Sequence, residues 1–110
     1  MAETISNDVP MTPADHRLVY ALTAVVCRVH EQGGARAALF ADELVRAWRQ
    51  CESRNAHVLR LHDAAGTLIK STTPADLGWA RARASQALAE FAEWRLALAL
   101  EQQRAREVAA

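Results

Sequence analysis

The sequence lacks the short patterns that mark common catalytic and metal sites. It has no glycine-rich phosphate loop, no Cys-x-x-Cys pair, no His-Glu-x-x-His helix motif and no serine at a nucleophile elbow. With these signatures missing, a novel enzyme would have to work with the four histidines of the chain. We therefore predict that the protein is not an enzyme and that it holds no cofactor and no metal ion.

Long hydrophobic runs are also missing. Arg28, Asp42 and Arg95 interrupt the best candidates, so no apolar stretch reaches the roughly 18 residues that a membrane-spanning helix needs. Near the N-terminus, Glu3 and Asp8 stand where a signal peptide carries lysine or arginine. We expect a chain that has no membrane segment and stays in the cytoplasm.

Cysteine is scarce, with Cys27 and Cys51 alone. Each falls inside a predicted helix among apolar neighbours, and unpaired cysteine is among the most buried residue types. Cytosolic thiols are also kept reduced. The sequence therefore predicts two reduced thiols within the core.

What the chain does contain is enough apolar material for one folded domain. Its composition is 51% hydrophobic and 24% charged, with 13 basic and 13 acidic residues. Disordered chains instead combine low hydrophobicity with high net charge. We predict a flexible tail over residues 1–11, followed by a single helical domain over residues 12–110.

The tetrapeptide Thr-Pro-Ala-Asp occurs twice, at residues 12–15 and 73–76. A threonine oxygen can accept a hydrogen bond from the first helical turn, proline fits the first helical position, and aspartate complements the positive helix end. The segments that follow the two copies share no pattern of apolar positions. We interpret both copies as helix starts, and not as a duplicated unit or a functional motif.

Apolar spacing predicts two helices in the first half of the chain. The first runs from Pro13 to Gln32, closed by Gly33-Gly34, and its wide apolar arc is typical of a central helix. The second runs from Ala35 to Ser53 and carries one buried stripe opposite a charged face. The residues of that stripe are Phe40, Leu44, Trp48 and Cys51.

A change of period follows the second helix. His57, Leu59 and Leu61 alternate with Val58, Arg60 and His62, and the next segment, Asp63-Ala64-Ala65-Gly66, ends on a turn-type glycine. This pattern predicts a β-hairpin at about residues 57–72. In a strand His57 and His62 would point to opposite faces, so a metal site shared with Asp63 is not expected.

The segment from Pro74 to about Arg106 is predicted to be one helix of roughly 50 Å, longer than a compact domain of this size. An apolar residue recurs every seven positions along it, at Leu77, Ala84, Phe91 and Leu98, with Ala80, Ala87 and Trp94 between. Two shorter helices and a hairpin cannot cover so long a helix, so we predict a homodimer or a protein partner. The candidate interface residues are Trp79, Phe91, Trp94, Leu98 and Leu100.

The expected fold class is therefore mainly α, with three helices, one β-hairpin between the second helix and the long C-terminal helix, and a dimeric assembly. This order also suggests an alternative function, because winged-helix DNA-binding regulators place a hairpin before a long dimerising helix. The basic surplus over Ala35 to His62 is only two charges, however, and phosphate binding favours a concentrated basic face. Nucleic acid therefore remains the less favoured partner.

In size, charge and helical layout, the chain resembles the small quorum-sensing anti-activators of the QslA type. The segments that carry this resemblance are the long helix through LAEFAEWRLALALEQQ and the central LVYALTAVVCRV. The resemblance implies a non-enzymatic regulator of transcription that docks on the ligand-binding domain of a LuxR-type transcription factor and blocks its dimerisation. It implies an interface on helix surfaces, and it assigns no individual residue.

Overall fold

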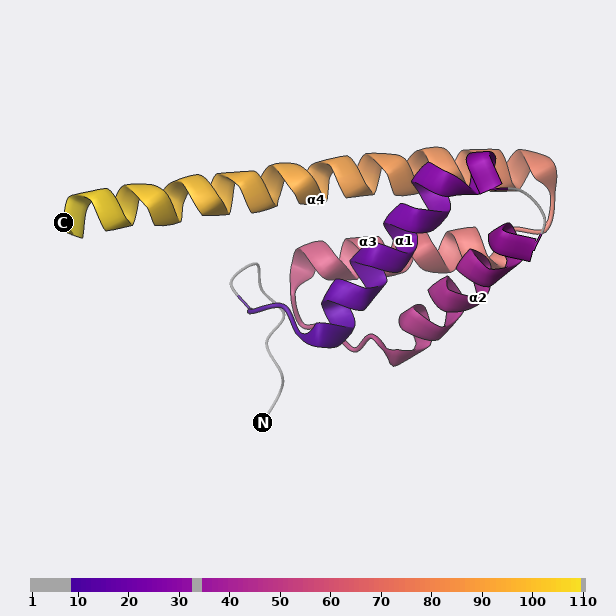
Figure 1. The fold of residues 1–110 in the computed structure, drawn as a ribbon, viewed down its shortest axis with the longest axis horizontal. Helices are drawn as coiled ribbons and strands as arrows, with labels where there is room; N and C mark the ends of the chain where they lie inside the picture. Colours follow the sequence, from indigo (N-terminus) through magenta and orange to yellow (C-terminus); the bar gives the residue numbers. More distant parts are fainter. Residues whose placement is uncertain (1–8, 33–34, 110) are drawn as a thin grey trace.

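The computed structural model describes residues 9–32 and 35–109, which form four α-helices (Figure 1). α1 spans Pro13–Gln32, α2 Ala35–Gln50, α3 Ala56–Lys70 and α4 Pro74–Ala109. These two ranges contain no β-strand, so the expected fold class of three helices and one hairpin is wrong. The first and last predicted helices are confirmed, the last one continuing three residues further. Gly33-Gly34, predicted to close the first helix, lie outside the described residues.

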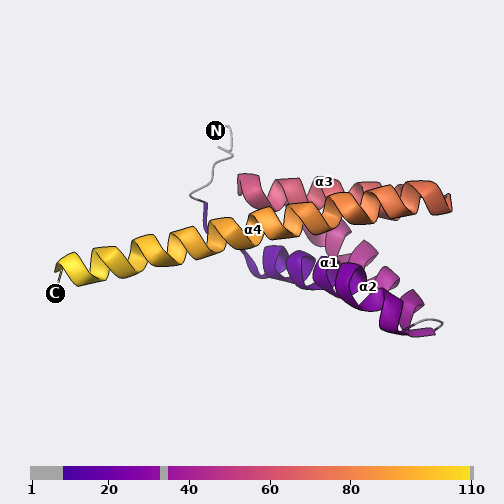
Figure 2. The same cartoon turned by 90° about the horizontal axis from the view of Figure 1, so that it is seen from above.

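The four helices are arranged as two helical hairpins. α1 packs against α2, α3 packs against α4, and α1 also contacts α3 and α4. Seen from above, α4 lies over the space between α3 and α1 (Figure 2). α1 is therefore flanked on more than one side, as its wide apolar arc predicted, and α3 likewise contacts all three other helices.

The predicted hairpin at about 57–72 is the helix α3. Its buried residues Val58, Leu61, Ala64, Ala65 and Leu68 are three or four positions apart, which is the spacing of one helix face. Asn55 caps the helix, because its side-chain oxygen accepts from the backbone N–H groups of His57 (2.9 Å) and Val58 (3.3 Å). The segment from His57 to His62 was interpreted as a strand because, over so few residues, the spacing of side chains on one face of an amphipathic helix also fits a two-residue period.

Gly66, which suggested a turn, lies inside α3 and allows α2 to approach closely. A Cβ at this position would lie 3.2 Å from Nε1 of Trp48, closer than an unstrained contact. The indole of Trp48 donates to the carbonyl oxygen of His62 at 3.0 Å, and the ring nitrogen Nε2 of His62 lies 3.0 Å from the carbonyl oxygen of Trp48. The glycine thus serves helix packing, and the prediction of a turn here was wrong.

α2 ends at Gln50, three residues before the predicted Ser53. Along its predicted stripe Leu44 and Cys51 are buried, and Phe40 and Trp48 are half-buried against the core. Both cysteines are unpaired. Cys51 is buried just after the helix, but Cys27 is exposed on α1, so the prediction of a core thiol is wrong at Cys27.

Both copies of Thr-Pro-Ala-Asp start helices, as predicted. The hydroxyl oxygen of Thr12 accepts from the backbone N–H of Asp15 (3.2 Å), and that of Thr73 accepts from the backbone N–H of Asp76 (3.1 Å). Pro13 and Pro74 are the first residues of α1 and α4. The two prolines lack the N–H that would otherwise be unsatisfied at this position.

α4 is packed on one side as far as Leu98 and is exposed on all sides beyond it. Ala80, Ala84 and Phe91 are buried on the side that faces the bundle, and Ala87 and Trp94 pack against the same core. Residues 99–109 are all exposed. Figure 1 shows this end of α4, in yellow, continuing well past the other three helices. We call residues 96–109 the projecting segment.

Candidate protein-binding surfaces

The buried carboxylate of Asp15 forms a polar cluster between α1 and the loop before α3. It accepts hydrogen bonds from the Thr12 backbone N–H (3.1 Å), the Ser53 hydroxyl (3.0 Å) and the Cys51 thiol (3.4 Å). Burial, and secondly the hydrogen bond and charge of Asp15, raise the pKa of Cys51 to about 12. The thiol therefore stays protonated at neutral pH and is unsuited to nucleophilic attack.

The same cluster holds residues 9–11, which the sequence assigned to a flexible tail. Asn55 is fully buried, and its side-chain N–H donates to the carbonyl oxygen of Val9 at 2.8 Å. Met11 is half-buried against the core. Every buried polar side-chain atom of the described residues is hydrogen-bonded. The Asp15 cluster therefore connects residues 9–11, the start of α1 and the loop before α3.

The three side chains considered for a metal site turn to different partners. The ring of His57 stacks on Trp94 with centroids 4.3 Å apart, His62 contacts Trp48, and Asp63 pairs with Arg83 at 3.2 Å. Burial, and then the charge of Arg60, lower the pKa of His57. Within the described ranges, no three His, Cys, Asp or Glu side chains are placed to hold a metal ion.

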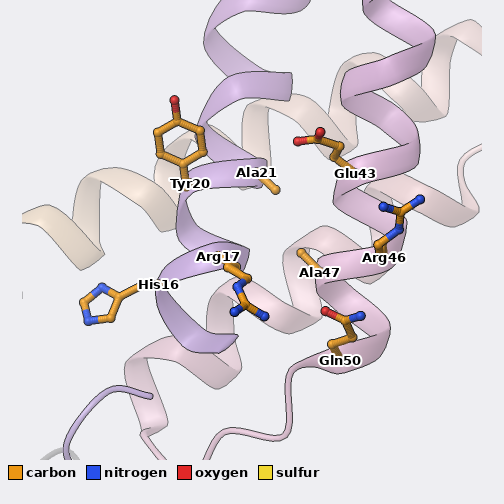
Figure 3. Close-up of a pocket in the computed structure, with 8 residues that line it drawn as sticks. All are labelled: His16, Arg17, Tyr20, Ala21, Glu43, Arg46, Ala47 and Gln50. Atoms are coloured by element: carbon orange, nitrogen blue, oxygen red, sulfur yellow. The ribbon is translucent and has the colours of Figure 1, made fainter. Parts of the chain in front are cut away.

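A shallow groove runs between α1 and α2 (Figure 3). Ala21 and Ala47 lie at its base, while Tyr20, Arg17 and Glu43 stand along its edges with His16, Arg46 and Gln50. The volume is about 400 Å³. The side chains that line it are spread along both edges and do not converge on one point.

Trp79 is the predicted interface residue that the structure leaves most exposed, at 60%. The Arg83 guanidinium lies 5.5 Å from the centre of its ring and also pairs with Asp63 of α3. Arg83, Asp63, Arg60 and Glu90 border a groove of about 250 Å³ between α3 and α4. We call Trp79 and these four residues the Trp79 surface.

The other predicted interface residues divide into two groups. Phe91 is buried, and Trp94 is half-buried between His57 and Phe91, so both pack within the chain. Leu98 is half-buried and lines a hollow with Trp94 and residues 9–11, whereas Leu100 is 46% exposed. The predicted heptad seam of α4 is thus largely used inside one chain.

A second apolar groove, of about 540 Å³, lies between α1 and α4 and was missed by sequence reasoning. α1 contributes Val19, Val26 and Cys27, and α4 contributes mostly small residues, Ser85, Ala89 and Ala92 among them. The available signal was the spacing of these small residues, at four- and three-residue steps that continue to Leu96 and Ala99.

Comparisons of the chain with protein-family models, with curated proteins and with solved structures found no match. Among the described residues, none of the helices is both long enough and apolar enough to span a bilayer.

Proposed function

We propose that the chain is a non-enzymatic protein-binding regulator, which binds a transcription factor through helix surfaces and inhibits it. Trp79 carries this proposal, because it is a large apolar side chain left 60% exposed. Tryptophan and arginine are the side chains that most often dominate the energy of protein interfaces. Here Arg83 lies beside the indole and also pairs with Asp63, so both residue types stand together on one exposed surface.

The partner that the resemblance to QslA-type anti-activators implies is the ligand-binding domain of a LuxR-type transcription factor. In this proposal the Trp79 indole enters an apolar pocket of that domain, and Arg83 with the other charged groups of the neighbouring α3–α4 groove supplies polar contacts to one side of it. The bound chain then covers the surface through which the factor dimerises. Such a regulator works in the cytoplasm, where its target binds DNA.

The alternative, a winged-helix DNA-binding regulator, depended on a β-hairpin at about residues 57–72. The predicted wing at about 57–72 is the helix α3, whose buried face packs into the core. A helix in this position offers no hairpin that could enter a groove of DNA. We therefore do not propose DNA binding.

The test is a calorimetric titration of the full chain with purified ligand-binding domains of LuxR-type regulators. We expect a complex, and we expect light scattering to show that the regulator's own dimer is lost. Trp79→Ala should weaken binding about tenfold or more. Tyr20→Ala is the matched control, because Tyr20 is an aromatic side chain 75% exposed on α1, and it should bind normally.

Both variants should melt at the temperature of the unchanged protein, because exposed side chains contribute little to stability. Absence of a complex with these domains would contradict the proposal. So would salt-dependent binding of the free chain to a generic DNA duplex, which is the behaviour of a DNA-binding protein.

A further inference from the structure

One exposed strip runs along α4 on the side away from α3. It consists of small and apolar residues with one terminal glutamine, at alternating four- and three-residue steps: Ser85, Ala89, Ala92, Leu96, Ala99 and Gln103. Such spacing keeps the residues on one side of a helix and is that of a helix-pairing seam. We call these six residues the outer strip. All six are exposed, whereas the predicted seam through Phe91 faces the core.

The outer strip has two differently covered halves. Its first half borders the α1–α4 groove, where Val19 and Val26 of α1 form the opposite wall. Its second half, from Leu96, lies on the projecting segment, which no other helix reaches (Figures 1 and 2). One part of the molecule therefore offers a groove beside a helix, and another part offers a bare helix.

We propose that a second copy of this chain covers the outer strip, with the two α4 helices antiparallel about a two-fold axis near residues 97 and 98. The inference rests on the proposed function, because both take the chain to act through its helix surfaces. In this arrangement each projecting segment lies along the α1–α4 groove of the partner. A parallel pair would instead bring both bundles to the same end, where each groove faces a bundle and not a bare helix.

The side chains fit this register in size. Leu96 lies opposite the partner's Ala99, and by symmetry Ala99 lies opposite the partner's Leu96. Ala92 lies opposite the partner's Gln103, so the layers nearest the two-fold axis each combine a larger residue with a small one. This alternation lets two helices interdigitate with their backbones close together. Leu96, 62% exposed in the single chain, becomes the central apolar contact.

The charges at the edge of the strip fit the same register. Glu93 and Arg104 are both exposed and lie on the same edge. In an antiparallel two-fold pair identical edges meet, so Glu93 of each chain comes to lie beside the partner's Arg104. Charged residues that flank a helix-pairing seam select partner and orientation. This charge pairing is satisfied only when the partner helix is another α4 in the antiparallel direction, which argues for a second copy as the occupant of the outer strip.

The first experiment is light scattering of the full chain on a sizing column over a range of concentrations. We expect a mass of twice 12.1 kDa. Leu96→Asp should give a monomer, because a carboxylate would be buried at the centre of the contact. Val108→Asp is the matched control in the same segment: Val108 is 87% exposed and lies about 120° around the helix from Leu96, so this variant should stay dimeric.

The second experiment measures orientation with single cysteines in a Cys27→Ser background, in which the remaining Cys51 is buried. Chains carrying Ala92→Cys are mixed with chains carrying Gln103→Cys and oxidised. The antiparallel register predicts a mixed disulfide dimer. A parallel pair predicts that each variant is linked mainly to itself, and that result would overturn the proposal.

The third experiment exchanges the two edge charges. Arg104→Glu should raise the dimer dissociation constant several-fold, because it places two acidic groups together, and adding Glu93→Arg should restore it. Glu43→Arg, on an exposed position of α2, is the control and should leave the dimer unchanged.

A monomeric chain at all concentrations, or a dimer that Leu96→Asp leaves intact, would refute the antiparallel dimer. Either result would leave the proposed function standing if the regulator domain still binds. Conversely, the antiparallel dimer without any regulator binding would support this inference and refute the proposed function.

Discussion

The two copies of Thr-Pro-Ala-Asp are identical sequences that lie in different surroundings. At residues 12–15 and 73–76 the threonine accepts the same backbone hydrogen bond, and the proline is the first residue of the helix. The aspartates differ, because Asp15 is 1% exposed and bonded to Cys51 and Ser53, while Asp76 is exposed. The four residues thus determine where a helix starts. They do not determine whether that helix start is buried and hydrogen-bonded to other segments of the chain.

The largest difference between the two copies should appear on removing the aspartates. Asp15→Ala leaves the Ser53 hydroxyl, the Cys51 thiol and the Thr12 N–H without their acceptor, and we expect it to lower the free energy of unfolding by about 3 kcal/mol. Asp76→Ala is the matched control and should cost about 0.5 kcal/mol, through the helix dipole alone. Urea denaturation of both variants measures the difference. Equal costs would mean that the Asp15 cluster contributes nothing beyond a helix cap.

An alkaline pH series should isolate the contribution of Cys51. Its pKa is raised from 9.0 to about 12 in the folded chain, so below pH 9 the thiol is protonated in both states and stability is unaffected. Between pH 9 and 12 the unfolded chain loses this proton first, and the free energy of unfolding should fall. At pH 10 the loss should be about 1 kcal/mol. Cys51→Ala should remove this part of the pH dependence, and an unchanged curve would contradict the assignment.

A thiol reagent at neutral pH tests the burial of Cys51 without any substitution. Cys27 is exposed in the single chain and should react with the native protein at concentrations where it is monomeric, whereas Cys51 is buried and should react only after urea is added. Two thiols that react together in the native state would show that the Asp15 cluster opens readily.

The smallest contrast is expected at the threonines. Thr12→Ala and Thr73→Ala each remove one cap hydrogen bond, and each should cost about 1 kcal/mol. The difference between them should lie within the error of urea denaturation, because neither hydroxyl has a further role in its cap. A much larger cost at Thr12 would show that the cap and the Asp15 cluster act as one unit.

The wrong prediction of a hairpin at α3 shows that a short pattern of residues does not determine secondary structure there. The alternation from His57 to His62 and the glycine at 66 both favoured a hairpin, and each has a helical explanation that depends on other segments. The buried face of α3 is defined by contact with the rest of the core, and Gly66 is required by the indole of Trp48, 18 positions earlier. The cap at Asn55 was the one local signal of a helix start that sequence reasoning passed over.

The candidate surfaces divide in a similar way. The sequence singled out Trp79 and Leu100, and both are exposed, but it could not separate them from Phe91 and Trp94, which pack within the chain. All four lie on one long helix with apolar residues on several sides. Only the position of α3 and α1 determines which of those sides is left uncovered.

By itself the sequence determined where α1 and α4 begin, the unbroken length of α4 and the absence of familiar catalytic motifs. These properties depend on caps, on proline positions and on residues within a few positions of one another. Only the tertiary structure decided that residues 56–70 form a helix, that Asp15 is buried and hydrogen-bonded, and that the chain's own helices leave the outer strip of α4 exposed. Those outcomes depend on contacts between residues far apart in the chain, and short-range spacing does not encode such contacts.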